Sequence, residues 1–300
     1  MRTSGRLRAD GRRWRRALIS GTWILAGGLA LAIGACTRAA PPAGESLVRL
    51  DLARVQNAGE PKRVLVVTHT AGFRHGSIPT AQQVLREMGE KSGLWTTEFA
   101  TNAEEVAQRI TAANLARTDL LIFANTTGEL PVTDEGKAAF QEWLTSGKGF
   151  VGMHSATDTF YRWPFFGRMI AGYFDGHPWH QKIVVRVEDR AFPGCESLGE
   201  SFEITDEIYQ FRDWTRSDKH VVLSVDNRSI DVSRGKRSDQ DYAIAWARHE
   251  GKGRVFYTSL GHRDEVWRDP RYQAHLLGGI RWALGLVQAK LEYGRKPAAP

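Results

Sequence analysis

Short, continuous apolar runs that alternate with helical patterns constrain the fold of this chain more than any other feature. The runs at 63–69, 119–124 and 149–154 have the length and continuity of strands buried on both faces. A further strand is expected over 95–100. Four strand–helix units in succession predict an α/β domain with a mostly parallel sheet and helices on both faces.

Helix start signals separate these strands. Ser77 with Pro79, and Thr133 before two acidic residues, are typical helix beginnings. Thr101 and Glu104 fit a capping box. The middle of the chain is more β-like, with expected strands at 182–187, 220–225, 242–247 and 254–260 before a last helix over 270–286. We therefore expect a β-rich insertion within a single domain over 62–286, followed by a tail over 287–300.

The net charge of +7 is a property of the N-terminus. Seven arginines and one aspartate precede Cys36, so the remaining chain carries 34 basic and 33 acidic side chains. No basic surface is implied for the folded domain, and a nucleic-acid partner is not expected.

The first residues have the order of a bacterial export signal. An arginine-rich start precedes an uncharged stretch over 17–35, and the run 31–36 resembles a lipobox ending at Cys36. We predict a lipoprotein signal peptide over 1–35, lipidation of Cys36 and a tether over 36–61. This places the protein on the periplasmic face of a bacterial membrane. The alternative is a retained N-terminal anchor, and the arginine pair at 15–16 faintly resembles a twin-arginine signal.

Residues that can carry chemistry follow several of the expected strands. Ligands of open parallel sheets bind beyond the carboxyl ends of the strands, so these residues are expected to share one rim. A single histidine or carboxylate in such a place is more often a loop or core hydrogen-bonder, and the set is more informative than any member. The candidates are Arg74, His75, His154, Ser155, Asp158, Glu207, Tyr209 and His262.

Two histidines, His177 and His180, enclose Trp179. Their spacing suits a metal chelate or a paired sugar contact, and the suggested cofactor is a divalent metal such as zinc. An exposed Trp179 would stack on the apolar face of a sugar ring. Otherwise Trp179 packs in the core and the two histidines only close a loop.

Six ordered segments carry a family resemblance over about residues 63–285. Together they resemble the ThuA-like (trehalose utilisation) family, which implies a flavodoxin-like fold related to class I glutamine amidotransferases and a link with sugar utilisation. The segments are GFRH at 72–75, HSATD at 154–158, FDGHPWH at 174–180, DEIY at 206–209, LGH at 260–262 and HLLGGIRW at 275–282.

The resemblance to amidotransferases gives His154 a particular place. Those enzymes hold a nucleophilic cysteine on a tight turn after a strand, and His154 stands where that cysteine would be. The thiol nucleophile is therefore missing, while His262 with Glu265 is similar to the amidotransferase base. Ser155 follows the turn position, where we expect a hydrogen-bond donor.

Three functions remain open at this stage. The first is an enzyme acting on a carbohydrate or an oxidised (keto) sugar by acid–base or metal-assisted chemistry. The second is a non-catalytic sugar-binding lipoprotein, and the third is a serine-dependent amidase-like hydrolase using Ser155. For the first, the expected catalytic residues are His154, His262, Asp158 and Glu207. The expected substrate contacts are Arg74, His75, Ser155, Trp179 and Tyr209, and the expected metal ligands are His177 and His180.

Overall fold

The computed structural model describes residues 60–295. The expected signal peptide, the lipidation at Cys36 and nearly all of the tether lie outside the described residues. Between residues 60 and 295, no helix has both the length and the apolar character needed to cross a membrane.

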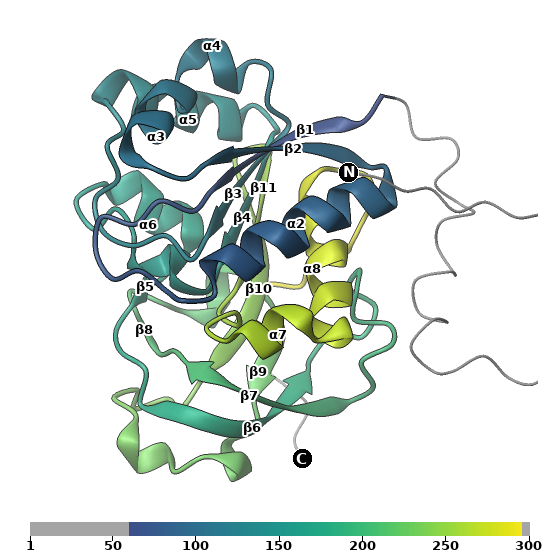
Figure 1. The fold of residues 1–300 in the computed structure, drawn as a ribbon. Helices are drawn as coiled ribbons and strands as arrows, with labels where there is room; N and C mark the ends of the chain where they lie inside the picture. The colour runs from purple at the N-terminus through teal and green to yellow at the C-terminus, as the bar shows by residue number, and fades with distance from the viewer. Residues whose placement is uncertain (1–59, 296–300) are drawn as a thin grey trace, which may run out of the picture. The chain divides into compact units, whose positions relative to one another are not determined.

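The core of the fold is one nine-stranded sheet with the order β2-β1-β3-β4-β11-β10-β9-β6-β7 (Figure 1). The first five strands in this order pair in parallel, and the remaining pairings are antiparallel. The expected β-rich segment thus extends the same sheet. The strands are β1 (Lys62–Val67), β2 (Trp95–Ala100), β3 (Leu120–Ala124), β4 (Gly149–Met153), β6 (Trp179–Val187), β7 (Ser201–Ile208), β9 (His220–Val225), β10 (Ala243–Glu250) and β11 (Gly253–Thr258), with β5 (Tyr173–Phe174) and β8 (Phe211–Arg212) forming a separate pair.

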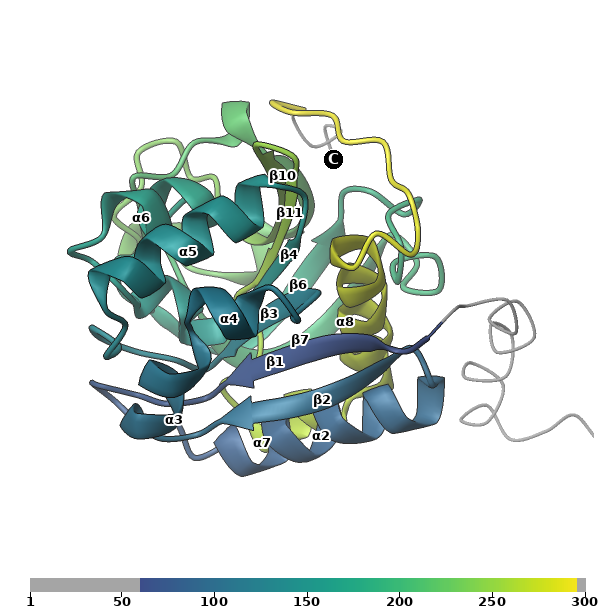
Figure 2. The ribbon, with the colours of Figure 1, turned by 90° about the horizontal axis from the view of Figure 1, so that it is seen from above.

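Helices cover both faces of the sheet, as Figure 2 shows. One face packs into a core with α2, α7 and α8, and the other packs with α3, α4, α5 and α6. This arrangement confirms the predicted α/β class. The helices are α2 (Ile78–Ser92), α3 (Ala103–Arg109), α4 (Ala112–Leu115), α5 (Asp134–Thr145), α6 (Pro164–Ile170), α7 (Asp264–Arg268) and α8 (Pro270–Ala283), and the short 3-10 helices are η2 (His154–Asp158), η3 (Arg216–Asp218), η4 (Asn227–Ser229) and η5 (Val232–Arg234).

The helix beginnings follow the sequence signals with two corrections. Ser77 stands directly before α2 as expected, but its side chain makes no capping hydrogen bond and donates instead to the Gly261 carbonyl. The Thr133 side chain caps α5 by accepting a hydrogen bond from the Gly136 amide, as expected. The predicted capping box before α3 is shifted by one residue. Asn102 is the cap, because its side chain accepts from the backbone of Glu105, and the Glu105 carboxylate in turn accepts from the backbone of Thr101.

One strand and the end of the folded domain also differ from the expectation. Strand β7 was not predicted, and its alternation of buried and exposed residues is that of an edge strand with one buried face. Beyond α8, the side chains of Val287, Ala289 and Leu291 pack against the core. The segment expected to be a tail therefore contributes to the folded domain up to at least residue 291.

Candidate functional site

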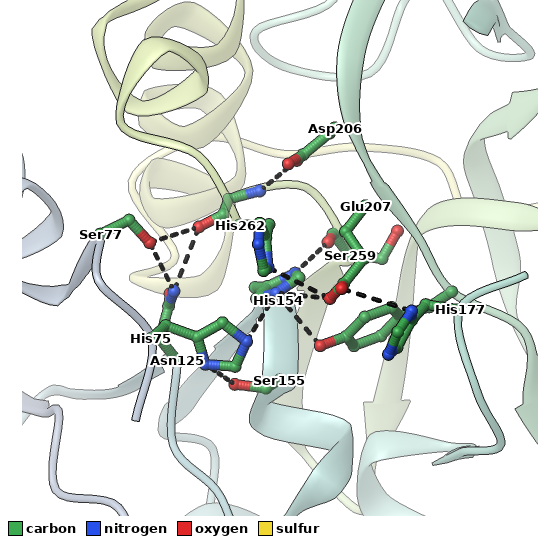
Figure 3. Close-up of polar contacts among 12 residues, drawn as sticks. His75, Ser77, Asn125, His154, Ser155, His177, Asp206, Glu207, Ser259 and His262 are labelled. Atoms are coloured by element: carbon green, nitrogen blue, oxygen red, sulfur yellow. Dashed lines mark hydrogen bonds and ion pairs between the residues drawn. The ribbon is translucent and has the colours of Figure 1, made fainter. Parts of the chain in front are cut away.

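Four side chains from separate parts of the chain meet at one edge of the sheet. His75, His154, Glu207 and His262 place one nitrogen or oxygen atom each within 4.8 Å of all the others (Figure 3). The first three are buried, and His262 is partly exposed. We call these four residues the histidine–glutamate cluster.

Strand direction explains why these residues meet. Strands β1, β4 and β11 run parallel, and the loops that follow them carry His75, His154 and His262. Between β11 and β7 there are four antiparallel pairings, so β7 again points the same way as β11. Glu207 lies near the carboxyl end of β7. The cluster is therefore built at the edge where ligands of open α/β sheets bind.

His154 occupies a strained turn directly after β4. Its backbone has a φ of 51°, a left-handed value that disfavours residues other than glycine. The Tyr257 hydroxyl donates a hydrogen bond of 2.6 Å to the His154 carbonyl and holds the turn. The His154 Nδ1 donates to the Ser259 carbonyl over 2.8 Å. Burial lowers the pKa of His154 well below its usual range, so the ring is neutral and its unprotonated Nε2 faces the cluster.

Several polar atoms crowd this one nitrogen. The Nε2 of His75 and the hydroxyl of Tyr209 each lie 3.1 Å from the His154 Nε2. A carboxylate oxygen of Glu207 lies 3.6 Å from the same atom. A neutral imidazole offers one lone pair here, so it cannot satisfy all of these neighbours at once.

Glu207 joins the two sides of the cluster. Its Oε2 lies 3.1 Å from the His262 Nδ1, and its Oε1 lies 3.4 Å from the His177 Nδ1. Burial alone would raise the pKa of Glu207, but the surrounding imidazoles lower it to about 2. The Glu207 carboxylate in turn raises the pKa of His262. Burial, together with the nearby His262, lowers the pKa of His75 to about 4.

A buried hydrogen-bond network positions His262 through its neighbour Gly261. The amide of Gly261 donates to the Asp206 carboxylate over 2.7 Å, and its carbonyl accepts from Ser77, Asn125 and the Trp267 indole. Asp206 is fully buried, and that burial raises its pKa to about 7. The sequence placed Asp206 in a family segment and Ser77 at a helix start, but it did not predict that they support His262. The signal in the sequence is Asp206 itself, a charged residue at one of the alternate positions of β7 that are buried.

The other expected site residues have separate environments. Ser155 is buried beneath the cluster, with its Oγ 3.4 Å from the His75 Nδ1, and Tyr209 contacts His154 directly. Arg74 is exposed beside His75. Asp158 accepts a hydrogen bond from Tyr161 and, among the described residues, forms no ion pair or hydrogen bond with the cluster.

Trp179 is a correction to the sequence analysis. Its ring has no exposed surface, packs edge-on against Tyr242 at 4.7 Å between centroids, and donates from Nε1 to the Asp231 carbonyl. A fully buried ring has no free face for stacking on a sugar, so Trp179 is a core residue.

The places of His177 and His180, the expected metal ligands, also differ from the expectation. His177 is half-exposed beside Glu207, and His180 is exposed with its ring 4.9 Å from that of His262. Across residues 60–295, the group of donors with spacing suited to a metal ion contains neither of them. The donors that could hold a cation are those of the histidine–glutamate cluster.

Comparisons with known proteins agree with this fold. The model of the family described as ThuA, trehalose utilisation, matches residues 63–283. A ThuA-like protein from Bacteroides uniformis ATCC 8492 superposes with a TM-score of 0.60 at 22% identity, covering 76% of this chain and 92% of that one. A ThuA-like protein from Parabacteroides merdae ATCC 43184 gives 0.61 at 18% identity, covering 79% and 92%. Curated protein sequences gave no significant match.

Proposed function

This chain belongs to the ThuA family, and from that membership we propose that it is an enzyme acting on a carbohydrate or an oxidised (keto) sugar at the histidine–glutamate cluster. The convergence of three imidazoles and one carboxylate within 4.8 Å carries the proposal. Buried titratable groups with strongly shifted pKa values are frequent at catalytic sites. Neutral His154 and charged Glu207 have the protonation states that proton transfer or metal-assisted chemistry requires.

An exposed aromatic ring beside the cluster supports a sugar as the substrate. The Phe73 side chain is 67% exposed, and its ring lies 4.9 Å from the ring of His75. The Thr127 side chain accepts from the amide of Gly72 and donates to the carbonyl of Phe73, which fixes this loop. An exposed aromatic ring on a hydrogen-bonded loop, next to reactive polar groups, suits stacking on the apolar face of a sugar ring.

A panel of sugars and keto-sugars tests the catalytic proposal. Calorimetry would measure binding of each compound, and product analysis would follow its conversion. The proposal expects binding and conversion of at least one carbohydrate of the panel. Tight binding without conversion of any compound would instead favour a non-catalytic sugar-binding protein.

A serine-dependent hydrolase is the second candidate, because the Ser155 Oγ lies 3.4 Å from the His75 Nδ1. Two features weigh against it. Ser155 is fully buried, and the pKa of His75 is lowered by burial to about 4, which makes that imidazole a weak base. We expect Ser155→Ala to keep turnover within about tenfold. Loss of nearly all turnover, with an acyl-enzyme detectable by mass spectrometry in the wild type, would support the hydrolase.

For its location, we propose export and lipid anchoring at Cys36, supported by the lipobox-like run 31–36. The test is metabolic labelling with a fatty acid, combined with membrane fractionation. Labelled protein in the membrane fraction that loses its label in Cys36→Ser is the expected result. Unlabelled membrane-bound protein of full length would indicate a retained anchor instead.

A further inference from the structure

We propose that the histidine–glutamate cluster binds one divalent transition-metal ion of the zinc class through His75 Nε2, His154 Nε2, Glu207 Oε2 and His262 Nδ1. The inference rests on the proposed function and deepens it. It assigns the cation to a different ligand set from the His177 and His180 pair that the sequence suggested.

The donor atoms have the chemistry and the spacing of such a site. Imidazole nitrogens with one carboxylate oxygen are ligands that zinc and related ions prefer. Bonds of about 2.0–2.1 Å to a tetrahedral ion place neighbouring donors about 3.3 Å apart. Three of the six donor separations are close to this value, at 3.1 Å for His154 to His75, 3.1 Å for His262 to Glu207 and 3.6 Å for His154 to Glu207, and all six lie within 4.8 Å.

Hydrogen bonding within the protein leaves this cluster incompletely satisfied. The His262 Nδ1 is buried, and beside its ion pair with the Glu207 carboxylate at 3.1 Å it has no further hydrogen-bond partner among the described residues. Buried polar atoms without a partner are rare and costly in folded proteins. A cation between these atoms would satisfy the His262 Nδ1 and the crowded lone pair of His154 together.

The outward-facing nitrogens of two imidazoles are oriented as in metal-binding histidines. The His154 Nδ1 donates to the Ser259 carbonyl over 2.8 Å, and the His75 Nδ1 lies 3.4 Å from the Ser155 hydroxyl. Metal-ligating histidines usually use their second nitrogen in this way, because the outer hydrogen bond fixes the tautomer and the ring plane. Both rings therefore direct Nε2 toward the proposed ion.

Side chains beside the proposed ion could also contact a keto-sugar. His177, close to Glu207 Oε1, and Tyr209, at the His154 Nε2, stand beside the donors as groups that can contact a ligand. A bound ion of this kind polarises a carbonyl or lowers the pKa of a coordinated water. A keto-sugar offers a carbonyl next to hydroxyl groups, so its oxygens suit both the ion and these side chains.

Metal analysis of the purified protein tests the inference. We expect about one zinc-class ion per chain, or saturation at one equivalent when zinc chloride is titrated into chelator-treated protein. Glu207→Gln and His262→Ala should weaken zinc binding at least about a hundredfold. The exposed histidine His249, which bonds to the Gly253 carbonyl on β10 and β11, provides the control, and His249→Ala should bind zinc as the wild type does.

Two further measurements keep the result interpretable. Cobalt(II) added to the wild type should give a visible absorption spectrum of a four- or five-coordinate nitrogen–oxygen site, which requires no variant to fold. Absence of stoichiometric binding, or equal affinity in all variants, would overturn the inference. Failure to bind zinc in a protein with full turnover would overturn the metal site and leave the proposed function standing, whereas stoichiometric zinc binding without any turnover would do the reverse.

Discussion

The Nδ1 of His154 donates its proton to the carbonyl of Ser259 over 2.8 Å. This hydrogen bond joins the turn after β4 to the segment after β11, and it determines which nitrogen of the buried ring faces the cluster. The elbow that resembles the amidotransferase nucleophile position therefore presents an unprotonated imidazole nitrogen. Such a group can accept a proton or bind a cation.

The left-handed backbone at His154 predicts an unusual order of stability among variants. With a φ of 51°, a side chain is strained at this position and glycine is not. In the presence of a chelator, His154→Gly should be more stable than His154→Ala by about 1 kcal/mol in urea unfolding. At the next residue, Ser155, φ is not positive, so alanine should be the more stable choice there. The same order at both positions would contradict the strained elbow.

The exposed ring of Phe73 predicts a binding effect. Removing an aromatic contact worth about 0.5–1.5 kcal/mol should raise KM for the sugar about two- to tenfold in Phe73→Ala. kcat should change little, because the ring lies outside the cluster. Steady-state kinetics provides the measurement, with Tyr293→Ala as the matched control at another exposed aromatic residue. An unchanged KM in Phe73→Ala would exclude the stacking role.

The buried His275 on α8 predicts a dependence of stability on pH. Burial lowers its pKa to about 3, against about 6.5 in the unfolded chain. Below pH 6.5 the unfolded state therefore binds a proton that the folded state does not, and the free energy of unfolding falls as the pH falls. Relative to His275→Gln, the wild type should lose about 2 kcal/mol between pH 7 and pH 5. Parallel stability curves for the two proteins, measured with a chelator present, would contradict this.

The sequence predicted β1, β3 and β4 because strands buried on both faces consist of nearly uninterrupted apolar residues. Strand β7 has one buried face, and the polar residues Ser201, Glu203 and Thr205 at alternate positions hide it from the same criterion. That omission matters, because β7 supplies Glu207 and the supporting Asp206. The family resemblance marked these acids, but only the strand pairing shows that β7 returns to the direction of β11.

The error at Trp179 and the different role of His180 have one physical cause. Neighbouring residues of a strand point to opposite faces. On β6 this turns Trp179 into the core and His180 outward, opposite Glu207 in the strand register. A spacing of three suits a chelate on a helix or a compact loop, whereas here His177 lies in the loop before β6 and His180 lies on the strand itself. The contact between His75 and His154 depends on how two loops pack, which no local pattern encodes.

The most direct test of the account compares Glu207→Gln with His249→Gln on the carbohydrate that the wild type converts. Glu207 touches both His154 and His262, so its loss should lower kcat at least about a hundredfold in a protein that unfolds as cooperatively as the wild type. His249→Gln should retain wild-type turnover. Equal turnover by Glu207→Gln and the wild type would show that the reaction does not take place at the histidine–glutamate cluster.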